Sequence, residues 1–266
     1  MKNTKLLPQA IILGLCSLLT ACAEHSTGGV APNAGDDPTD YKTEWPLGPT
    51  SLDRSLIDVV VAKGVPQEVA NVAFNKYDQF VNRVTNSEYM TIIDFTQHSG
   101  KERMWMINTK TKQVDALNVA HGVGSDPKDT GVPVRFSNVP DSKMSSIGAY
   151  LVAEKYQSTN HGTAMRLDGL ESTNDRVRDR AIVLHSAGYV SAKRSLMGMS
   201  WGCPAISLDW IGRALQRLSG GSFMYAYANP ALTNPAMDDL QIQQIMLDPA
   251  YKWVNESEEA PFDGAR

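Results

Sequence analysis

The sequence predicts a mostly β fold with added helices (an α+β arrangement). Between residues 89 and 120, segments rich in β-branched, aromatic and aliphatic residues are separated by turn residues such as Ser99-Gly100, which is typical of a strand meander. Continuous apolar runs later in the chain indicate buried strands. Helical spacing of apolar residues is seen before residue 89 and after residue 206. The later strands are expected at residues 150–154, 181–184 and 223–227.

Helices are expected on both sides of this β region. Gly64 ends the first helix, and Pro66, a favoured first residue, opens the second. Ser207 is expected to cap a third helix, and Gly220 to end it. The first two helices are expected to pack on the β region, with a separate glycan-binding role as the alternative. The third is expected to bury a stripe formed by Leu208, Ile211, Leu215 and Leu218.

The N-terminal segment has the features of an export signal. Two lysines precede an apolar run at residues 11–19, which is too short to span a membrane. The run closes with Leu19-Thr20-Ala21-Cys22, which resembles a bacterial lipobox, so Cys22 is expected to carry lipid and to anchor the protein stably. An ordinary cleaved signal peptide is the alternative. Ala23 after the cysteine indicates the outer membrane, on its periplasmic face.

The cysteines and the net charge narrow the function. Cys16 lies in the removed signal and Cys22 would be lipidated, so the mature chain keeps one thiol, Cys203, in a compartment where structural cysteines usually pair. That thiol is either an inert buried residue or a reactive one. A net charge of −4 and a pI near 5.7, with no basic run, argue against nucleic acid as a partner.

The residues around Cys203 favour a reactive thiol. Gly202 precedes it and would let a substrate carbonyl approach the backbone, whereas Pro204 follows it and has no N–H to donate. The apolar run at residues 181–184 delivers His185 at its end. A histidine that accepts the thiol proton generates the attacking thiolate. The amides of Gly202 and Cys203 would then stabilise an oxyanion.

These residues resemble the site of a known enzyme family. Arg180-Ala-Ile-Val-Leu-His185 and Ser200-Trp201-Gly202-Cys203-Pro204 resemble the YkuD-type L,D-transpeptidases, which cross-link peptidoglycan, and in particular their divergent murein L,D-transpeptidase branch. The family has Ser-His-Gly-Cys at the second segment, so Trp201 replaces a histidine. The resemblance covers residues 90–228 and implies an L,D-transpeptidase-like β-sandwich or barrel catalytic domain.

The resemblance also implies a reaction. Cys203 would attack the peptide carbonyl that follows the L-centre of diaminopimelate in a stem tetrapeptide, and His185 would take the thiol proton and later protonate the departing D-amino acid. Ser186 matches the position whose backbone carbonyl orients the imidazole in relatives. An amine would resolve the acyl-enzyme in a transpeptidase, and water in an L,D-carboxypeptidase. The resemblance implies no metal or cofactor, and carbapenems are candidate covalent inhibitors.

Further residues are candidates for contacting peptidoglycan. Arg166 would hold a stem carboxylate, with a salt bridge to Asp168 or Glu171 as the alternative. His121 would line the cleft or bond to the backbone, and Trp201 would stack on sugar, cover the cleft or pack internally. His121 and His161 are also candidates to replace the family's second histidine. The complete set of candidates is Tyr150, Arg166, Trp201, His121 and His161.

Two other functions stay open from the sequence. A zinc peptidase would use His161, Asp168 and His185, although the chain has no His-Glu-x-x-His motif. A non-catalytic lipoprotein would bind the cell wall and tether it to the membrane. The expected organisation is a lipoprotein signal peptide at 1–21, a flexible tether at 22–50, a helical extension at 51–88, the catalytic domain at 89–228, and a C-terminal extension at 229–266 with a short helix at 239–246.

Overall fold

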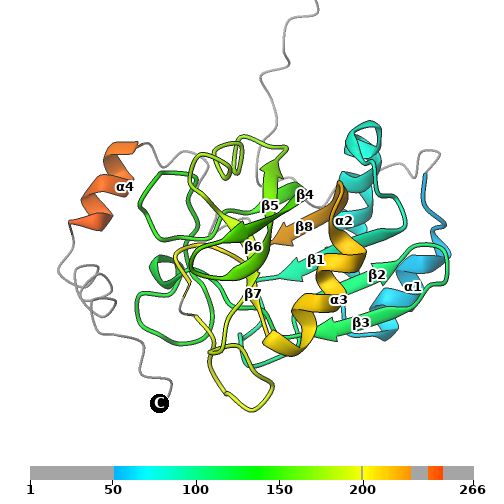
Figure 1. Ribbon diagram of the computed structural model, residues 1–266, viewed down its shortest axis with the longest axis horizontal. Coiled ribbons are helices and arrows are strands. Elements are labelled where there is room, and N and C mark those ends of the chain that lie inside the picture. Colours follow the sequence, from blue (N-terminus) through cyan, green and yellow to red (C-terminus); the bar gives the residue numbers. More distant parts are fainter. Residues whose placement is uncertain (1–50, 199, 229–238, 248–266) are drawn as a thin grey trace, which may run out of the picture. The chain divides into compact units, whose positions relative to one another are not determined.

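The computed structural model describes residues 51–198, 200–228 and 239–247. Within them the protein is mostly sheet, with a nearly closed, barrel-like sheet and a few helices, which confirms the predicted fold class (Figure 1). The predicted signal peptide, Cys22, the tether and most of the C-terminal extension lie outside the described residues. No helix in the described part of the chain is long and apolar enough to cross a membrane.

The described strands form one eight-stranded sheet in the order β3-β2-β1-β8-β4-β5-β6-β7. β1, β2 and β3 form the predicted antiparallel meander, and β4 and β5 form a long antiparallel hairpin. The bounds are β1 (Tyr89–Asp94), β2 (Met104–Asn108), β3 (Val114–Leu117), β4 (Gly148–Ser158), β5 (Gly162–Gly169), β6 (Val183–Ser186), β7 (Ala205–Ile206) and β8 (Ser222–Tyr227).

The last strand in the chain lies in the middle of the sheet. β8 pairs in parallel with β1, where Phe223 is opposite Met90, and antiparallel with β4, where Ala226 is opposite Gly148. It therefore joins the N-terminal meander to the β4–β5 hairpin. β6 and β7 continue the sheet beyond β5, and these two strands run parallel to each other.

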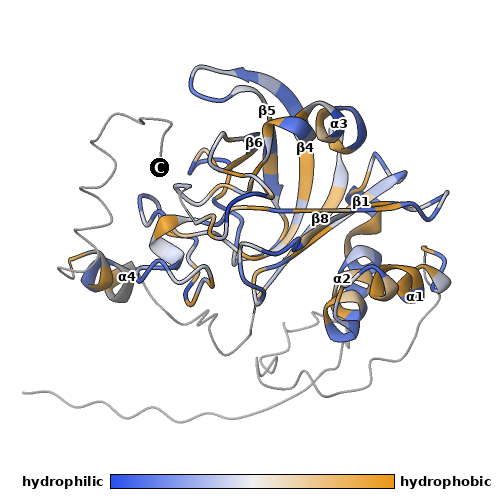
Figure 2. Ribbon diagram, turned by 90° about the horizontal axis from the view of Figure 1, so that it is seen from below, coloured by the Kyte–Doolittle hydropathy of each residue, from blue (hydrophilic) through white to orange (hydrophobic). Residues whose placement is uncertain are grey.

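The first two helices share a core with the sheet. α1 and α2 pack against β1, β2 and β8 in one apolar cluster that includes Phe74, Trp105 and Phe223. The indole N–H of Trp105 also donates to the carbonyl oxygen of Lys63, at the end of α1, over 2.9 Å. β1 and β8 carry hydrophobic residues along much of their length (Figure 2). The helices are α1 (Ser55–Ala62), α2 (Gln67–Phe80), η1 (Val81–Arg83), η2 (Val123–Ser125), α3 (Leu208–Leu218) and α4 (Asp239–Met246).

Helix α3 differs from its prediction at its first turn. Ser207 stands at the N-cap, but its side chain makes no capping hydrogen bond. Ala214 and Leu218 are buried in the second apolar cluster of the sheet, which also contains Met104, Leu167 and Met224. Leu208 is instead 64% exposed. The buried stripe begins one turn later, at Ile211, which packs on this cluster. The expectation that Leu208 is buried is therefore wrong.

Replacing Phe74 with alanine should strongly destabilise the protein. Because Phe74 is buried between α2 and the sheet, Phe74→Ala should lower the free energy of unfolding by about 3–5 kcal/mol. Urea denaturation followed by circular dichroism measures this change. Gln79→Ala, on the exposed side of the same helix, is the control and should change stability by less than about 0.5 kcal/mol. Equal effects of the two substitutions would contradict a shared core.

Candidate active site

The ring of His185 is held by the backbone at the end of β6. Its Nδ1 atom lies 3.0 Å from the carbonyl oxygen of Ser186, which is the contact that the family resemblance implies. Because a carbonyl only accepts hydrogen bonds, Nδ1 carries the proton and Nε2 is the unprotonated nitrogen of the neutral ring. The imidazole is thus held in the tautomer that accepts a proton at Nε2.

Burial keeps His185 uncharged. The residue is 2% exposed, and its removal from water lowers its pKa to about 4. The hydrogen bond to Ser186 acts in the opposite direction, and the positive charge that His161 can carry lowers the pKa further. At neutral pH the ring is therefore neutral and able to act as a base.

Cys203 lies next to His185 because β6 and β7 are paired in parallel. His185 is opposite Ala205, and its amide nitrogen lies 3.4 Å from the carbonyl oxygen of Pro204. Cys203 directly precedes Pro204 in the chain. The two principal residues of the predicted site thus occupy neighbouring positions at the β7 edge of the sheet.

The thiol of Cys203 is buried and protonated. Cys203 is 8% exposed, and its Sγ accepts a hydrogen bond from the amide of Val183 at 3.4 Å and lies 4.0 Å from the carbonyl oxygen of Ala181. Burial raises the pKa of the thiol to about 11, although the Val183 amide and the charge of Arg180 both favour the thiolate. Among the described residues, no hydrogen bond joins this thiol to the ring of His185.

Gly202 is required by the shape of the loop that precedes Cys203. Its φ angle is +110°, a conformation that residues with a side chain rarely adopt. A Cβ atom there would lie 2.6 Å from the carbonyl oxygen of Met144. Ser145 holds the same turn, because its hydroxyl donates to the carbonyl oxygen of Gly202 at 3.2 Å. The close approach that the sequence assigned to a substrate carbonyl is made here by the protein's own backbone.

The side chain of Ser200 braces both ends of this loop. Its hydroxyl oxygen accepts a hydrogen bond from the amide of Gly202 at 3.3 Å, and the hydroxyl donates to the carbonyl oxygen of Cys203 at 2.6 Å. The Gly202 amide, expected to bind an oxyanion, is therefore engaged within the loop. The amide of Cys203 is the candidate donor that follows from this geometry.

A cluster of buried polar and charged side chains supports this loop. The guanidinium of Arg103 donates to Nδ1 of His121 at 2.8 Å, and Nε2 of His121 lies 3.5 Å from a carboxylate oxygen of Asp126. Burial lowers the pKa of Arg103 to about 9 and that of His121 to about 4, so at neutral pH the first is charged and the second is neutral. The charges of Arg103 and Asp126 therefore balance each other across an uncharged ring.

This arrangement corrects the prediction for His121. Its ring is fully buried and does not line a cleft. Instead, its backbone carbonyl accepts a hydrogen bond from the amide of Ser200 at 3.2 Å, and its ring packs so closely on Gly198 that a Cβ atom there would lie 2.6 Å from Nε2. His121 thus supports the segment that leads to Cys203.

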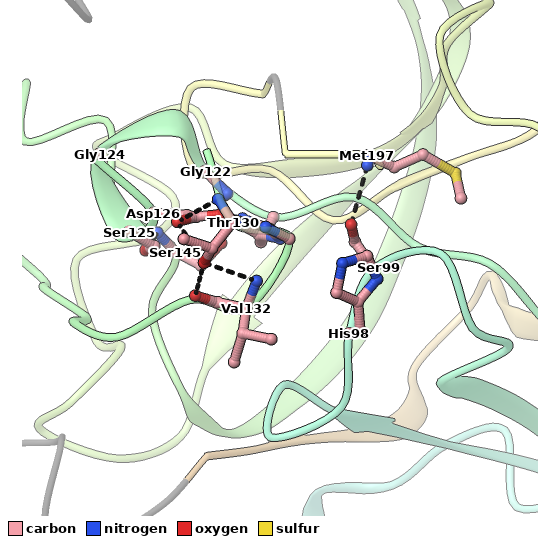
Figure 3. A network of polar contacts seen from close by, with 12 residues as sticks. His98, Ser99, Gly122, Gly124, Ser125, Asp126, Thr130, Val132, Ser145 and Met197 are labelled. Carbon is pink, nitrogen blue, oxygen red and sulfur yellow. Dashed lines mark hydrogen bonds and ion pairs between the residues drawn. The ribbon is translucent and has the colours of Figure 1, made fainter. Parts of the chain in front are cut away.

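Asp126 and Ser99 tie neighbouring loops to the same region (Figure 3). The Asp126 carboxylate accepts hydrogen bonds from the amides of Thr130 and Gly131 at 3.0 Å and 2.6 Å. The hydroxyl oxygen of Ser99 accepts one from the amide of Met197, three residues before Ser200, at 2.8 Å. Residues from two loops, the β1–β2 loop and the β3–β4 loop, therefore fix the position of the segment before Cys203.

His161 is brought to the site, and Asp168 is not. The ring of His161, in the turn of the β4–β5 hairpin, stacks on the ring of His185 with 3.8 Å between centroids. The carboxylate of Asp168 instead pairs with the guanidinium of Arg178. Within the described ranges, no group of three or more His, Cys, Asp or Glu side chains is arranged to hold a metal ion.

Tyr150 and Arg166 are not placed as the sequence predicted. Tyr150 is buried in the second apolar cluster of the sheet, where burial also raises the pKa of its hydroxyl, so it cannot contact a substrate. Nε of Arg166 lies 3.4 Å from a carboxylate oxygen of Glu154, and its guanidinium lies 4.3 Å from the ring centroid of Tyr156. Arg166 is thus in a salt bridge, but its partner is on the adjacent strand β4 and is neither of the two acidic residues predicted.

Trp201 is exposed within the loop that leads to Cys203. The residue is 59% exposed, and Nζ of Lys143 lies 4.2 Å from its ring centroid, which is a cation–π contact. Internal packing, one of the roles left open by the sequence, is therefore wrong for Trp201. Its exposed ring, next to Gly202 and Cys203, stays available for contact with a substrate.

Arg180 is a supporting residue whose partners the sequence did not reveal. Its guanidinium donates to the carbonyl oxygens of Ser137 and Met144, both at 2.8 Å, and to the hydroxyl of Ser146 at 2.6 Å. It thus fixes the segment that touches Gly202, and its charge lowers the pKa of Cys203. These partners lie 34 to 43 residues away in the chain, so no local pattern could identify them.

Comparison with known families assigns the chain to a class. Residues 61–227 match the family of L,D-transpeptidase catalytic domains, and this span is more than half of the chain. The protein therefore belongs to the L,D-transpeptidase catalytic domain family, as the sequence motifs indicate. The match begins in α1, before residue 89, which agrees with the core that α1 and α2 share with the sheet. A search of curated proteins gave no match.

Solved structures of L,D-transpeptidases are also similar to this chain. An L,D-transpeptidase from Mycobacterium smegmatis has a TM-score of 0.36 and 13% identity, covering 53% of this chain and 59% of that one. One from Stackebrandtia nassauensis has a TM-score of 0.35 and 11% identity, covering 66% and 77%. The L,D-transpeptidase LdtMt1 in complex with imipenem has a TM-score of 0.33 and 12% identity, covering 53% and 59%. The chain spans about three fifths of the length of the first and third of these proteins.

Substituting Gly202 should distort the loop formed by residues 200–203. Gly202→Ala forces a side chain into a positive-φ conformation and against the Met144 carbonyl, so it should destabilise the protein by at least about 2 kcal/mol. Thermal and urea unfolding measure this loss. Gly188→Ala is the matched control, because its Cβ would meet no atom within 4 Å and its φ is not positive. A destabilised Gly188→Ala with an unaffected Gly202→Ala would contradict the geometry described.

Stability should fall between pH 7 and pH 5. The pKa values of His121 and His185, both about 4, lie below the ordinary value of 6.5. In this window the unfolded chain therefore binds more protons than the folded one, so acid favours unfolding. Each histidine should contribute a loss of about 2 kcal/mol from pH 7 to pH 5, and above about pH 7.5 the contribution should be constant. Urea unfolding at several pH values measures the slope, and His185→Gln should make it shallower; an unchanged slope would count against a neutral, buried His185.

Proposed function

We propose that this protein is a peptidoglycan L,D-transpeptidase that uses Cys203 as its nucleophile and His185 as its general base. The observation that carries this proposal is the pairing of β6 with β7, which sets a neutral histidine of defined tautomer next to a lone thiol. Membership of the L,D-transpeptidase catalytic domain family supplies the class of substrate, the stem peptides of peptidoglycan.

The first half of the reaction is acyl transfer to the thiol. Nε2 of His185 takes the proton of Cys203, and Sγ attacks the carbonyl carbon after the L-centre of diaminopimelate, so that a C–S bond forms. The C–N bond to the terminal D-amino acid then breaks, and the imidazolium returns its proton to the departing amine. The D-amino acid leaves with a neutral amine, and the rest of the stem peptide stays bound to Cys203 as a thioester.

The nucleophile must turn before it attacks. In the structure its Sγ faces the Val183 amide and the Ala181 carbonyl, and the pKa of the thiol is raised to about 11. Rotation about the Cα–Cβ bond of Cys203 would release these contacts and direct the S–H toward Nε2 of His185. The thiolate would therefore form only after the thiol has turned toward His185.

One backbone amide is the candidate donor to the oxyanion. The Cys203 amide is adjacent to the attacking sulfur, whereas the Gly202 amide is bonded to Ser200 and the following residue, Pro204, has no N–H. A donor at this position typically contributes about 3 kcal/mol to lowering the activation barrier. Ser200 therefore acts on catalysis indirectly, by fixing the carbonyl and the loop conformation of Cys203.

The second half of the reaction determines the product. Nε2 of His185 takes a proton from a stem-peptide amine as the amine attacks the thioester carbonyl. A new amide bond forms, the C–S bond breaks, and the imidazolium gives this proton to the departing sulfur, which regenerates the thiol. Attack of water by the same route gives an L,D-carboxypeptidase. We assign the amine as acceptor because the family is one of transpeptidases, and analysis of the muropeptide products distinguishes the two outcomes.

The lipobox-like segment supports a location at the cell envelope. We propose that the signal is cut before Cys22, that Cys22 is lipidated, and that residues 22–50 tether the domain to the periplasmic face of the outer membrane. Cys22→Ala should then move the protein from the membrane fraction to the soluble periplasm. Unchanged fractionation would contradict the lipid anchor.

Cys203 should form a covalent adduct with donor substrates and with a carbapenem. The intact mass of the purified protein should rise after incubation with a carbapenem or with tetrapeptide-bearing muropeptides, and the muropeptides should lose a terminal D-amino acid or become cross-linked. Cys203→Ala should show neither change, and His185→Ala should slow adduct formation by about 10²–10⁴-fold.

Folded controls make this test decisive. Asn160→Ala, in an exposed turn, should react like the wild type, and circular dichroism should show that Cys203→Ala is folded. If folded wild-type protein gives no adduct and leaves the muropeptides unchanged, the proposed reaction is wrong. Retained binding to intact peptidoglycan would then favour the non-catalytic lipoprotein.

A further inference from the structure

A second histidine ring lies flat on the ring of the proposed base. The rings of His161 and His185 are stacked with 3.8 Å between their centroids and 27° between their planes. His185 is almost fully buried, whereas His161 is exposed on its other side. The stack therefore separates a face of the His185 ring from solvent.

The register of the sheet explains how these distant residues meet. β5 pairs antiparallel with β6, with Arg166 opposite Val183 and Met165 opposite Leu184. The same register continued by one residue would bring Ala164 opposite His185, so the tip of the β4–β5 hairpin lies past the end of β6. The chain folds back there at Gly162, whose φ of +65° suits glycine although space around it is open.

We infer that His161 is a positioning residue for His185: its ring fixes the plane of the base and shields it from water. This inference rests on the proposed function, because it takes His185 as the general base. It replaces the role of substrate contact that the sequence assigned to His161. One face of the His161 ring is occupied by the ring of His185, so His161 acts through His185.

The stack leaves the chemistry of His185 unobstructed. The nitrogens of an imidazole lie in the ring plane, so a partner on the face blocks neither of them. Nδ1 is bonded to the carbonyl of Ser186, and the Nε2 edge is left for the thiol of Cys203. The Ser186 carbonyl fixes one edge of the ring and His161 fixes its tilt, and together they restrict the two torsions of the side chain.

The stack also suits two neutral rings better than two charged ones. The titratable groups placed around His185 are His161 from the β4–β5 hairpin and Cys203 from the segment before β7. Burial lowers the pKa of His161 as well. The positive charge that His161 can carry in turn lowers the pKa of His185, whereas Cys203 has no such effect. Removing the ring of His161 would admit water to His185 and remove this repulsion, and both changes favour the imidazolium.

The test compares His161→Ala, which removes the ring, with His161→Phe, which keeps a stacking ring without a titratable nitrogen. The first measurement is the pKa of His185, from NMR titration of its ring signals in the whole protein. His161→Ala should raise this pKa from about 4 toward about 6, whereas His161→Phe should leave it near the wild-type value because the shielding face is retained. Asn160→Ala, in the same turn, is the matched control and should leave it unchanged.

The second measurement is the rate of Cys203 acylation by a carbapenem as a function of pH. In His161→Ala the acidic limb of the pH–rate profile should move to higher pH, so the acylation rate should fall about tenfold at pH 5 and much less at pH 8. His161→Phe should restore most of the rate at pH 5. A purely structural role of His161 would lower the rate equally at both pH values.

The two measurements separate this inference from the proposed function. An unchanged His185 pKa in His161→Ala, or a His161→Phe variant that behaves like His161→Ala in both measurements, would overturn the positioning role. Wild-type protein that is never acylated would overturn the proposed reaction, and the NMR titration would still decide whether His161 shields His185.

Discussion

The parallel pairing of β6 with β7 is the contact on which the site depends. β6 carries His185 and β7 follows Cys203, and the two strands are paired through only two residue pairs. So short a ladder contributes little by itself, and the positions of both residues need support from outside the sheet. Ala120, which bonds to the carbonyl of Ala205 at 2.8 Å, and the Ser200 contacts with His121 and Val123 supply that support.

The support is largely polar and buried. Arg103, His121 and Asp126 form one buried group that supports the loop before Cys203, and Arg180 holds the segment that touches Gly202. Buried charges are costly unless they are paired and bonded, and replacing such groups by apolar ones often stabilises a fold. Their presence here is understandable as a means of fixing one conformation of a glycine-containing loop, since hydrogen bonds are directional and apolar contacts are not.

The thiol of Cys203 and the imidazole of His185 are both uncharged at neutral pH. Burial lowers the pKa of His185 and raises that of Cys203, so both perturbations oppose formation of the thiolate–imidazolium pair. If Cys203 is the nucleophile, as we propose, rotation of its thiol toward His185 would allow it to ionise despite these pKa shifts, and the stacked ring of His161 would keep His185 aligned.

The sequence alone determined the elements and the two principal residues. Strands and helices follow from apolar periodicity, which is a local property, and Cys203 and His185 stand out by residue type, by the lone thiol and by the motif around each. Folding decided the rest. Tyr150 and His121 proved to be buried, Arg166 found its partner on β4, and His161 reached His185, because each outcome depends on which strands become neighbours and in what register. The protonation states of the thiol and the imidazole were likewise settled only by burial, since solvent exclusion is created by residues far away in the chain.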